Sequence, residues 1–263
     1  MAARDNVLFH ASIASGTTAG TVTPLTLLYG VENVRQGYGT PKLKHIRAIY
    51  DGGYSGTSTG VRVSVKNSNW IDEAGLLAAQ ADAPISLNRD SYNFLRGRDK
   101  VLAPNTSWTI TATVTTTTTA AADVYVLLEI EYSDVPGVNA ENLAGSPVLK
   151  ECKNASYTAA ANVPVSLGSF DNLLQGVTYI LAEASLTQDG APTASGANFI
   201  ILEGFSQQRG LTRIIPASCY GLADQIEGSV YLTKQTYNVL LLRSVSNSAN
   251  AMTVGFEMIA STN

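Results

Sequence analysis

Residues 56–60 have the GxSxG spacing that, in some hydrolases, places a nucleophilic serine on a sharp strand-to-helix turn. The serine of this segment is Ser58. Such an enzyme needs a histidine that follows the serine along the chain and acts as its general base. Both histidines, His10 and His45, precede Ser58, and the surrounding sequence is typical of a turn between strands. The sequence therefore predicts no nucleophile here.

Glu129 and Glu257 stand at matching places in two similar segments, and a pair of carboxylates is what glycosidases use. Because the two residues belong to separate modules of the sequence, we expect them to lie far apart, each at a solvent-facing strand position. The histidines lack the HxxxH and HxH spacings, and the acidic residues lack the spacing of a calcium loop. We therefore expect no metal, no cofactor and no enzymatic activity.

The two cysteines, Cys152 and Cys219, have no CxxC spacing and no neighbouring histidine. Such cysteines are typically small buried hydrophobic residues rather than metal ligands. The sequence leaves open whether they are paired in a disulfide.

Most of the chain alternates apolar and polar residues with a period of two, the pattern of half-buried β-strands. Residues 108–132 predict two antiparallel strands joined by a short Thr/Ala loop, and residues 237–260 predict a second hairpin of the same kind. Residues 43–50 and 60–66 predict a further hairpin.

Two segments depart from simple alternation. Residues 21–28 alternate but contain Pro24, which assigns them to the edge of a sheet or to a strand start. Residues 71–80 are compatible with a short helix, although Gly75 weakens it.

The second half of the chain repeats the strand and turn patterns of the first half in the same order, which indicates an internal duplication. We expect a first module over residues 1–134, a linker rich in Pro, Gly, Asn and Ala over residues 135–147, and a second module over residues 148–263. Many short strands separated by turns predict an all-β protein made of two tandem antiparallel β-sandwiches, jelly-roll-like in each module. An immunoglobulin-like sandwich is the alternative.

The composition limits the partners. Charged residues make up 14% of the chain, against about 25% in typical soluble domains, so the exposed surface must be mostly Thr, Ser, Asn, Gln and Gly. The formal net charge of −4 argues against direct nucleic-acid binding, which needs a basic face. The sequence has no apolar run long enough to span a bilayer and no convincing secretory signal. We expect synthesis in a cytoplasm and a surface that packs against other proteins.

The most charged segment, residues 88–100, has two interpretations. One is a solvated loop, and the other is an arm that contacts carboxylates or phosphates of a neighbouring subunit. The candidate subunit-contact residues are the basic and aromatic ones: Arg89, Tyr92, Phe94, Arg96, Arg98 and Lys100.

The chain resembles structural proteins of viruses, especially bacteriophages, in its duplicated β modules, its weak charge and its Thr and Ala tracts at residues 115–119 and 120–122. The chain resembles two classes of virion protein: capsid decoration or cement proteins, and double jelly-roll major capsid proteins. The short, nearly neutral segments at residues 1–6 and 261–263 favour decoration. The resemblance implies a virion location on the capsid surface, capsid proteins as partners, and a homo-oligomer, either trimer or dimer.

A clamp between neighbouring subunits is the mechanism that we expect from a decoration protein. The loops at residues 31–41 and 70–100 are the expected contacts. The other alternative is a receptor- or carbohydrate-binding module of a tail or fibre. Such a module needs an exposed aromatic platform. Its candidate residues are Tyr38, Tyr54, Trp70, Tyr92 and Tyr220.

Overall fold

The chain forms two compact all-β units in the computed structural model. The first unit is Asp5–Ser133, and the second comprises Asp134–Asn263 with Met1–Arg4. The structure describes residues 3–52, 61–70, 74–77, 79–80, 100–133, 148–157, 161–170, 173–175, 177, 179–188, 197–204, 211–217, 231–232, 237–243 and 250–260. Every regular element in these ranges is a strand, which confirms the predicted fold class. The predicted linker at residues 135–147 lies outside the described residues, so the module limits stay a prediction.

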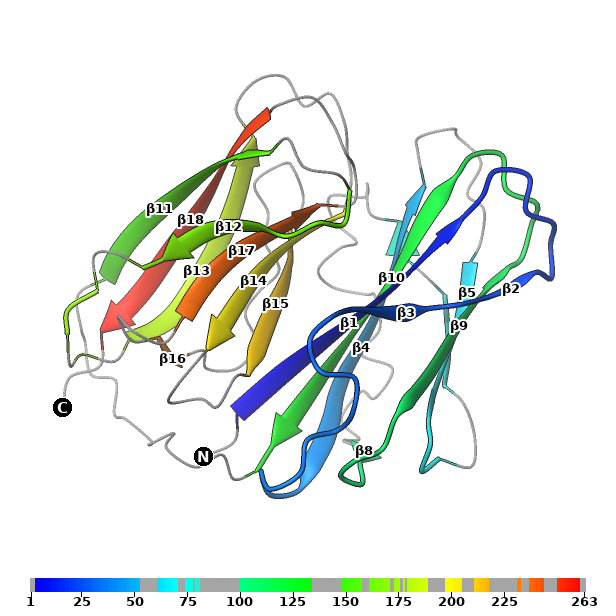
Figure 1. Cartoon of the computed structure of the whole chain (residues 1–263), viewed down its shortest axis with the longest axis horizontal. Helices are drawn as coiled ribbons and strands as arrows, with labels where there is room; N and C mark the ends of the chain where they lie inside the picture. Colours follow the sequence, from blue (N-terminus) through cyan, green and yellow to red (C-terminus); the bar gives the residue numbers. More distant parts are fainter. Residues whose placement is uncertain are drawn as a thin grey trace. The chain divides into compact units, whose positions relative to one another are not determined.

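The first unit contains two sheets (Figure 1). One sheet has the order β3 (Thr26–Tyr29), β1 (Ala3–Ile13), β10 (Ala122–Tyr132), β4 (Pro41–Gly52) and β7 (Ala79–Gln80), with β8 (Lys100–Val101) also paired to β4. The other has the order β2 (Val22–Pro24), β9 (Trp108–Val114), β5 (Val61–Asn67) and β6 (Ala74–Leu77). We call them the first and second sheets of this unit.

The second unit also contains two sheets. One has the order β11 (Val148–Tyr157), β18 (Asn250–Ala260), β13 (Tyr179–Gln188) and β16 (Tyr231–Leu232). The other has the order β12 (Val165–Ser169), β17 (Tyr237–Arg243), β14 (Asn198–Gly204) and β15 (Thr212–Ala217). Buried residues of both sheets, among them Leu181, Ile200, Leu241 and Phe256, form one hydrophobic core. The two sheets therefore pack face to face as a sandwich.

The two units share one strand order. Numbered along the chain, β11 to β18 are strands 1 to 8, and they form sheets of order 1-8-3-6 and 2-7-4-5. The first unit has the same two orders once its additional strands β3 and β7 are left out. Strands 1 to 8 are then, in chain order, β1, β2, β4, β5, β6, β8, β9 and β10. Two four-stranded sheets in this order make a jelly roll. An immunoglobulin fold has a different order, so the immunoglobulin alternative was wrong.

The strand numbered 3 in this shared order, β4 in the first unit and β13 in the second, carries a β-bulge at the same place in both units. In β4 the extra residue is Lys44, opposite the step that follows Glu129 in β10. In β13 the extra residue is Ala182, opposite the step that follows Glu257 in β18. An internal duplication explains why strand order and bulge position coincide, and it remains our interpretation of them.

The predicted hairpins at residues 108–132 and 237–260 were wrong in their pairing. The strands exist, but β9 pairs with β2 and β5 whereas β10 pairs with β1 and β4, so the connection crosses from one sheet to the other. The same crossing separates β17 from β18. The predicted pairing of residues 43–50 with 60–66 fails likewise, because β4 and β5 belong to different sheets. Alternation shows that one face of a strand is buried, but it does not identify the strand's partner.

Two further expectations can be compared with the structure. The predicted helix at residues 71–80 was wrong, because its described residues form β6 and β7, which are held by pairing with β5 and β4. The edge position predicted for residues 21–28 is confirmed: β2 and β3 lie at the edges of their sheets, with the buried Leu25 between them. The amide of Leu25 donates to the carbonyl of Ile110 at 2.9 Å.

Candidate functional site

Polar side chains gather on the outer face of the first sheet of the first unit. In β10, Asp123 and Glu129 fall on alternate positions from Val124 and Leu128, which are fully buried. Because side chains alternate along a strand, the two carboxylates lie on the face that points away from the core. The side chain of Asp123 is 23% exposed. It lies beside His10 of the neighbouring strand β1, whose side chain is 17% exposed.

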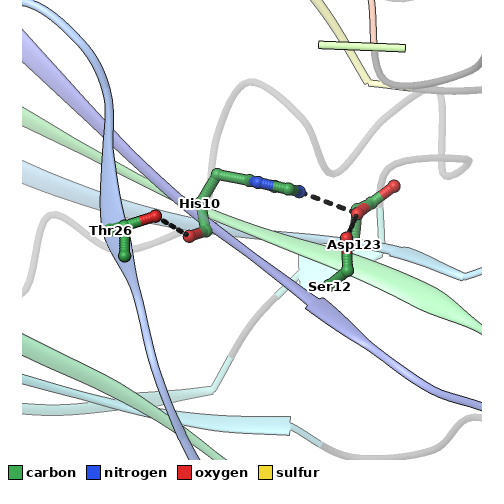
Figure 2. Close-up of polar contacts among 4 residues, drawn as sticks. All are labelled: His10, Ser12, Thr26 and Asp123. Carbon is green, nitrogen blue, oxygen red and sulfur yellow. Dashed lines mark hydrogen bonds and ion pairs between the residues drawn. The ribbon is translucent and has the colours of Figure 1, made fainter.

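His10 and Ser12 converge on one carboxylate oxygen, as Figure 2 shows. The distance from His10 Nε2 to Asp123 Oδ1 is 2.7 Å, and the Ser12 hydroxyl donates to the same oxygen at 2.6 Å. On the other side, the Thr26 hydroxyl of β3 donates to the carbonyl of His10 at 3.4 Å. The imidazole also lies against the buried ring of Tyr125, with ring centroids 4.9 Å apart.

This arrangement has the residue types of a serine hydrolase without its geometry. In a catalytic triad the histidine stands between the serine and the carboxylate and takes the serine proton. Here Asp123 stands in the middle, and the Ser12 hydroxyl donates to its carboxylate. The Ser12 proton points at a carboxylate and not at an imidazole, so the three residues do not form a catalytic triad. The three side chains instead link β1 to β10.

A second histidine and carboxylate lie further along the same face. His45 Nε2 of β4 is 4.0 Å from Glu129 Oε1 of β10, and Lys44 Nζ is 3.7 Å from Glu131 Oε1. Glu129 is only 6% exposed, so the expectation that it faces solvent was wrong. Its strand is buried on both faces near this point, since Leu127 and Leu128 are both buried. These pairs link β4 to β10 as His10 and Ser12 link β1 to β10.

A buried ion pair holds the loop that precedes β4. Arg35 Nε donates to Asp5 Oδ2 at 2.6 Å, and Asp5 is 1% exposed. Burial by itself lowers the pKa of Arg35, but the carboxylate of Asp5 outweighs this effect, so the pKa of Arg35 is raised. The backbone amide of Arg35 donates to the phenol oxygen of Tyr132 at 2.9 Å. Burial raises the pKa of Tyr132 well above its usual range.

These contacts fix one of the loops that was expected to touch neighbouring subunits. The amide of Val34 donates to the carbonyl of Thr106 at 3.0 Å, and the amide of Asn105 donates to the carbonyl of Val34 at 2.8 Å. Residues on the outside of the loop, such as Val31 and Gln36, stay exposed. The loop is therefore held by its own unit and presents only its outer side chains.

Of the predicted subunit-contact residues, only Lys100 is described by the structure. Arg89, Tyr92, Phe94, Arg96 and Arg98 lie outside the described residues. Lys100 is exposed in β8, and its ammonium nitrogen lies 3.8 Å from the centroid of the Trp70 ring. This is a cation–π contact, so the Lys100 head group is held against its own unit.

Two of the five aromatic residues considered for a sugar platform belong to the described part of the chain, and both pack against other aromatic rings. Trp70 is 8% exposed and meets Trp108 edge to face, with centroids 5.6 Å apart. Tyr38 is half-buried against Tyr132, with centroids 5.7 Å apart. Tyr54, Tyr92 and Tyr220 lie outside the described residues, as do Ser58 and Cys219. Cys152 lies in β11.

Within the described residues, no three His, Cys, Asp or Glu side chains lie together in a way that could hold a metal ion. In the same part of the chain, no helix has the length and apolar character to cross a membrane. Sequence reasoning missed the cluster of His10, Ser12 and Asp123. The period of two placed His10 and Ser12 on one face, but Asp123 is more than a hundred positions away, and no local signal pairs them.

No protein-family model matches the chain, and no curated protein matches it. Three solved structures are similar to it: the structure of infectious bursal disease virus Gx strain, recombinant N-glycanase F (PNGase F), and the triple jelly roll fold and turret assembly in an archaeal virus. The first has 9% identity and a TM-score of 0.27, covering 99% of this chain and 72% of that chain.

N-glycanase F has 11% identity and a TM-score of 0.24, covering 98% of this chain and 96% of that chain. The archaeal virus structure has 13% identity and a TM-score of 0.22, covering 98% of this chain and 59% of that chain. TM-scores this low do not show that the chain shares a fold or a function with any of the three structures. The fold assignment therefore rests on the strand order of each unit, and the comparisons place the chain in no family.

Proposed function

We propose that this chain is a non-enzymatic structural subunit of a viral shell, built as a double jelly-roll coat protein. The observation that carries the proposal is that two successive units of one chain have the same jelly-roll strand order. Jelly rolls are a common architecture of viral capsid proteins, and they also occur in lectins and cupins.

The chemistry of the described residues supports a structural role. The His10, Ser12 and Asp123 cluster joins two strands, and Asp5 with Arg35 fixes a loop. Both use polar side chains to hold neighbouring parts of the first unit together. A chain with only 14% charged residues also has few ions to desolvate when its surface is covered by other subunits.

A capsid decoration or cement protein is the second candidate. The same low charge suits a protein that attaches to a finished shell, because the interface must then be desolvated in one binding step. In this case the chain would bind a lattice made by another protein and would clamp neighbouring subunits from outside. The two candidates differ in whether the chain makes the lattice by itself.

Assembly of the purified full-length chain tests the proposal. A coat protein is expected to form capsomers or closed shells, visible by negative-stain electron microscopy, as the protein concentration rises. A decoration protein is expected to stay small alone and to bind shells that lack it, with a gain in heat resistance. The proposal fails if the chain neither assembles nor binds shells, or if particles that contain it hold only a few copies.

A further inference from the structure

Two uncharged loops meet at one end of the first unit. Residues 14–21 connect β1 to β2, and residues 115–121 connect β9 to β10. Strand pairing places both loops at the same end of the unit, because Val22, just after the first loop, pairs with Thr113, which lies just before the second. We call these two loops the threonine end.

Hydrogen bonds join the two loops into one rigid piece. The amide of Gly16 donates to the carbonyl of Thr118 at 2.9 Å, and the amide of Thr118 donates to the carbonyl of Thr17 at 2.9 Å. The Thr118 side chain is 3% exposed; its hydroxyl donates to the carbonyl of Ala14 at 2.8 Å and accepts from the amide of Thr17 at 2.8 Å. Loops that are already ordered lose little conformational entropy on binding.

The outer side of the threonine end carries hydroxyls and methyls. Neither loop contains a charged or aromatic residue, and residues such as Ser15, Thr18, Thr116 and Thr117 are exposed. A hydroxyl both donates and accepts hydrogen bonds, so such a surface can be its own complement. A surface rich in one sign of charge cannot, because two copies would repel each other.

The second unit repeats the turn that shapes this end. In the first unit Gly20 has φ 87°, and its amide donates to the carbonyl of Val114, the last residue of β9, at 2.8 Å. In the second unit Asn162 has φ 62°, and its amide donates to the carbonyl of Arg243, the last residue of β17, at 2.7 Å. Residues 158–164 and 244–249, which connect the corresponding strands, also contain no charged residue.

We propose that the threonine end is a self-association surface, which packs against the same surface of a second copy of this chain. The inference rests on the proposed function and names the partner in it. A copy is the partner that fits best, because each chain has a formal charge of −4 and two copies meet with least repulsion where both are uncharged. A carbohydrate fits less well, since sugar sites on β-sandwiches use aromatic platforms and these loops contain none.

Sedimentation velocity of the full-length chain tests the proposal, with lysines placed on the exposed part of the threonine end. The test variant is Thr116→Lys with Thr117→Lys. One control, Thr116→Ser with Thr117→Ser, keeps both hydroxyls. The other, Asn69→Lys with Ser107→Lys, puts the same charges near the start of β9, at the opposite end of the unit. The melting temperature of each variant checks that it folds.

Wild type and both controls are expected to associate alike, with little dependence on salt. The lysine variant is expected to associate on the order of tenfold more weakly, about 1.4 kcal/mol, at an unchanged melting temperature. Equal association of the lysine variant and wild type would overturn the inference. So would a lysine variant that associates normally but loses binding to a neutral glycan.

The experiment separates this inference from the proposed function. If wild type forms shells and the lysine variant forms them equally well, the function stands and the threonine end is not the contact. If wild type forms neither oligomers nor shells and binds none, both proposals fail.

Discussion

At the scale of single residues, Gly30 occupies a position that no other residue fits. Its φ is +95°, and a Cβ built there would lie 2.7 Å from the backbone oxygen of Asn6 and 3.2 Å from the Cα of Val7. Both obstacles are backbone atoms of β1, so they cannot rotate away. Glycine is therefore required by the approach of the loop to β1 as well as by the backbone conformation.

Gly30→Ala is expected to destabilise the first unit more than Gly37→Ala. Gly37 has a similar φ of +83°, but a Cβ there would meet nothing within 4 Å, so its substitution carries conformational strain alone, about 1–2 kcal/mol. Gly30→Ala adds a backbone collision, and we expect a loss of about 3 kcal/mol or more. Urea denaturation of the two variants measures the difference, and equal losses would show that the close approach does not matter.

Tyr132 gives the stability of the first unit a dependence on alkaline pH. Burial raises the pKa of its phenol, and the nearby carboxylate of Asp5 adds to this, while the amide of Arg35 opposes it. An unfolded tyrosine ionises near pH 10, so the folded state binds the proton more tightly than the unfolded state. Its contribution is present in full below about pH 10 and is lost progressively as the pH rises above that value.

Tyr132→Phe is expected to lower stability at pH 8 by about 1 kcal/mol, because the amide of Arg35 loses its acceptor. Above pH 10 the variant should lose stability less steeply than wild type, by up to about 1.4 kcal/mol per pH unit. Denaturant midpoints across this range test it, with Tyr38→Phe as the matched control. Parallel curves for wild type and Tyr132→Phe would show that this phenol is not the source of the slope.

At the scale of elements, Thr118 joins two loops that are about a hundred residues apart in sequence. Thr118→Val keeps the shape of the side chain but removes the hydroxyl that bonds Ala14 and Thr17. We expect a cost of about 1 kcal/mol, because the carbonyl of Ala14 and the amide of Thr17 each lose a hydrogen bond. The amides of Gly16 and Thr118 should also exchange hydrogen faster in this variant.

Thr118→Ser is the control for this prediction, because it keeps the hydroxyl and loses only a methyl group. It should retain the slow amide exchange and cost less than Thr118→Val. If both variants exchange equally fast, the methyl packing of Thr118 holds the loops together rather than its hydroxyl.

The sequence predicted the strands well and their partners poorly. The alternation in residues 61–67 and 108–114 matches strands β5 and β9, in which every second side chain is buried. The same pattern suggested hairpins, because strands that are close in sequence usually pair. In a jelly roll the chain passes between sheets at these connections, and this depends on contacts distant in sequence.

The polar cluster was hidden from the sequence for the same reason. Each of His10, Ser12 and Asp123 looks like an ordinary strand residue, and only the pairing of β1 with β10 brings them together. Glu129 was misplaced because alternation assigned it to the outer face, which is correct, and we equated that face with solvent. Burial of an outer face is a tertiary property that a single strand does not encode.

At the scale of the whole chain, two jelly rolls with one strand order and one bulge position follow each other. The second unit buries a core of its own, because described residues from both of its sheets form one hydrophobic cluster. A tandem pair supplies two similar surfaces per chain, so one polypeptide can make several equivalent contacts in a lattice. This is the physical reason why two similar units per chain would suit the proposed shell subunit.

Cryo-electron microscopy of particles assembled from the purified chain tests the central claim most directly. The account predicts a continuous shell whose density is filled by this chain, with two eight-stranded sandwiches per copy. A chain that remains monomeric at high concentration, and that is missing from the shell of every particle in which it is produced, would contradict it.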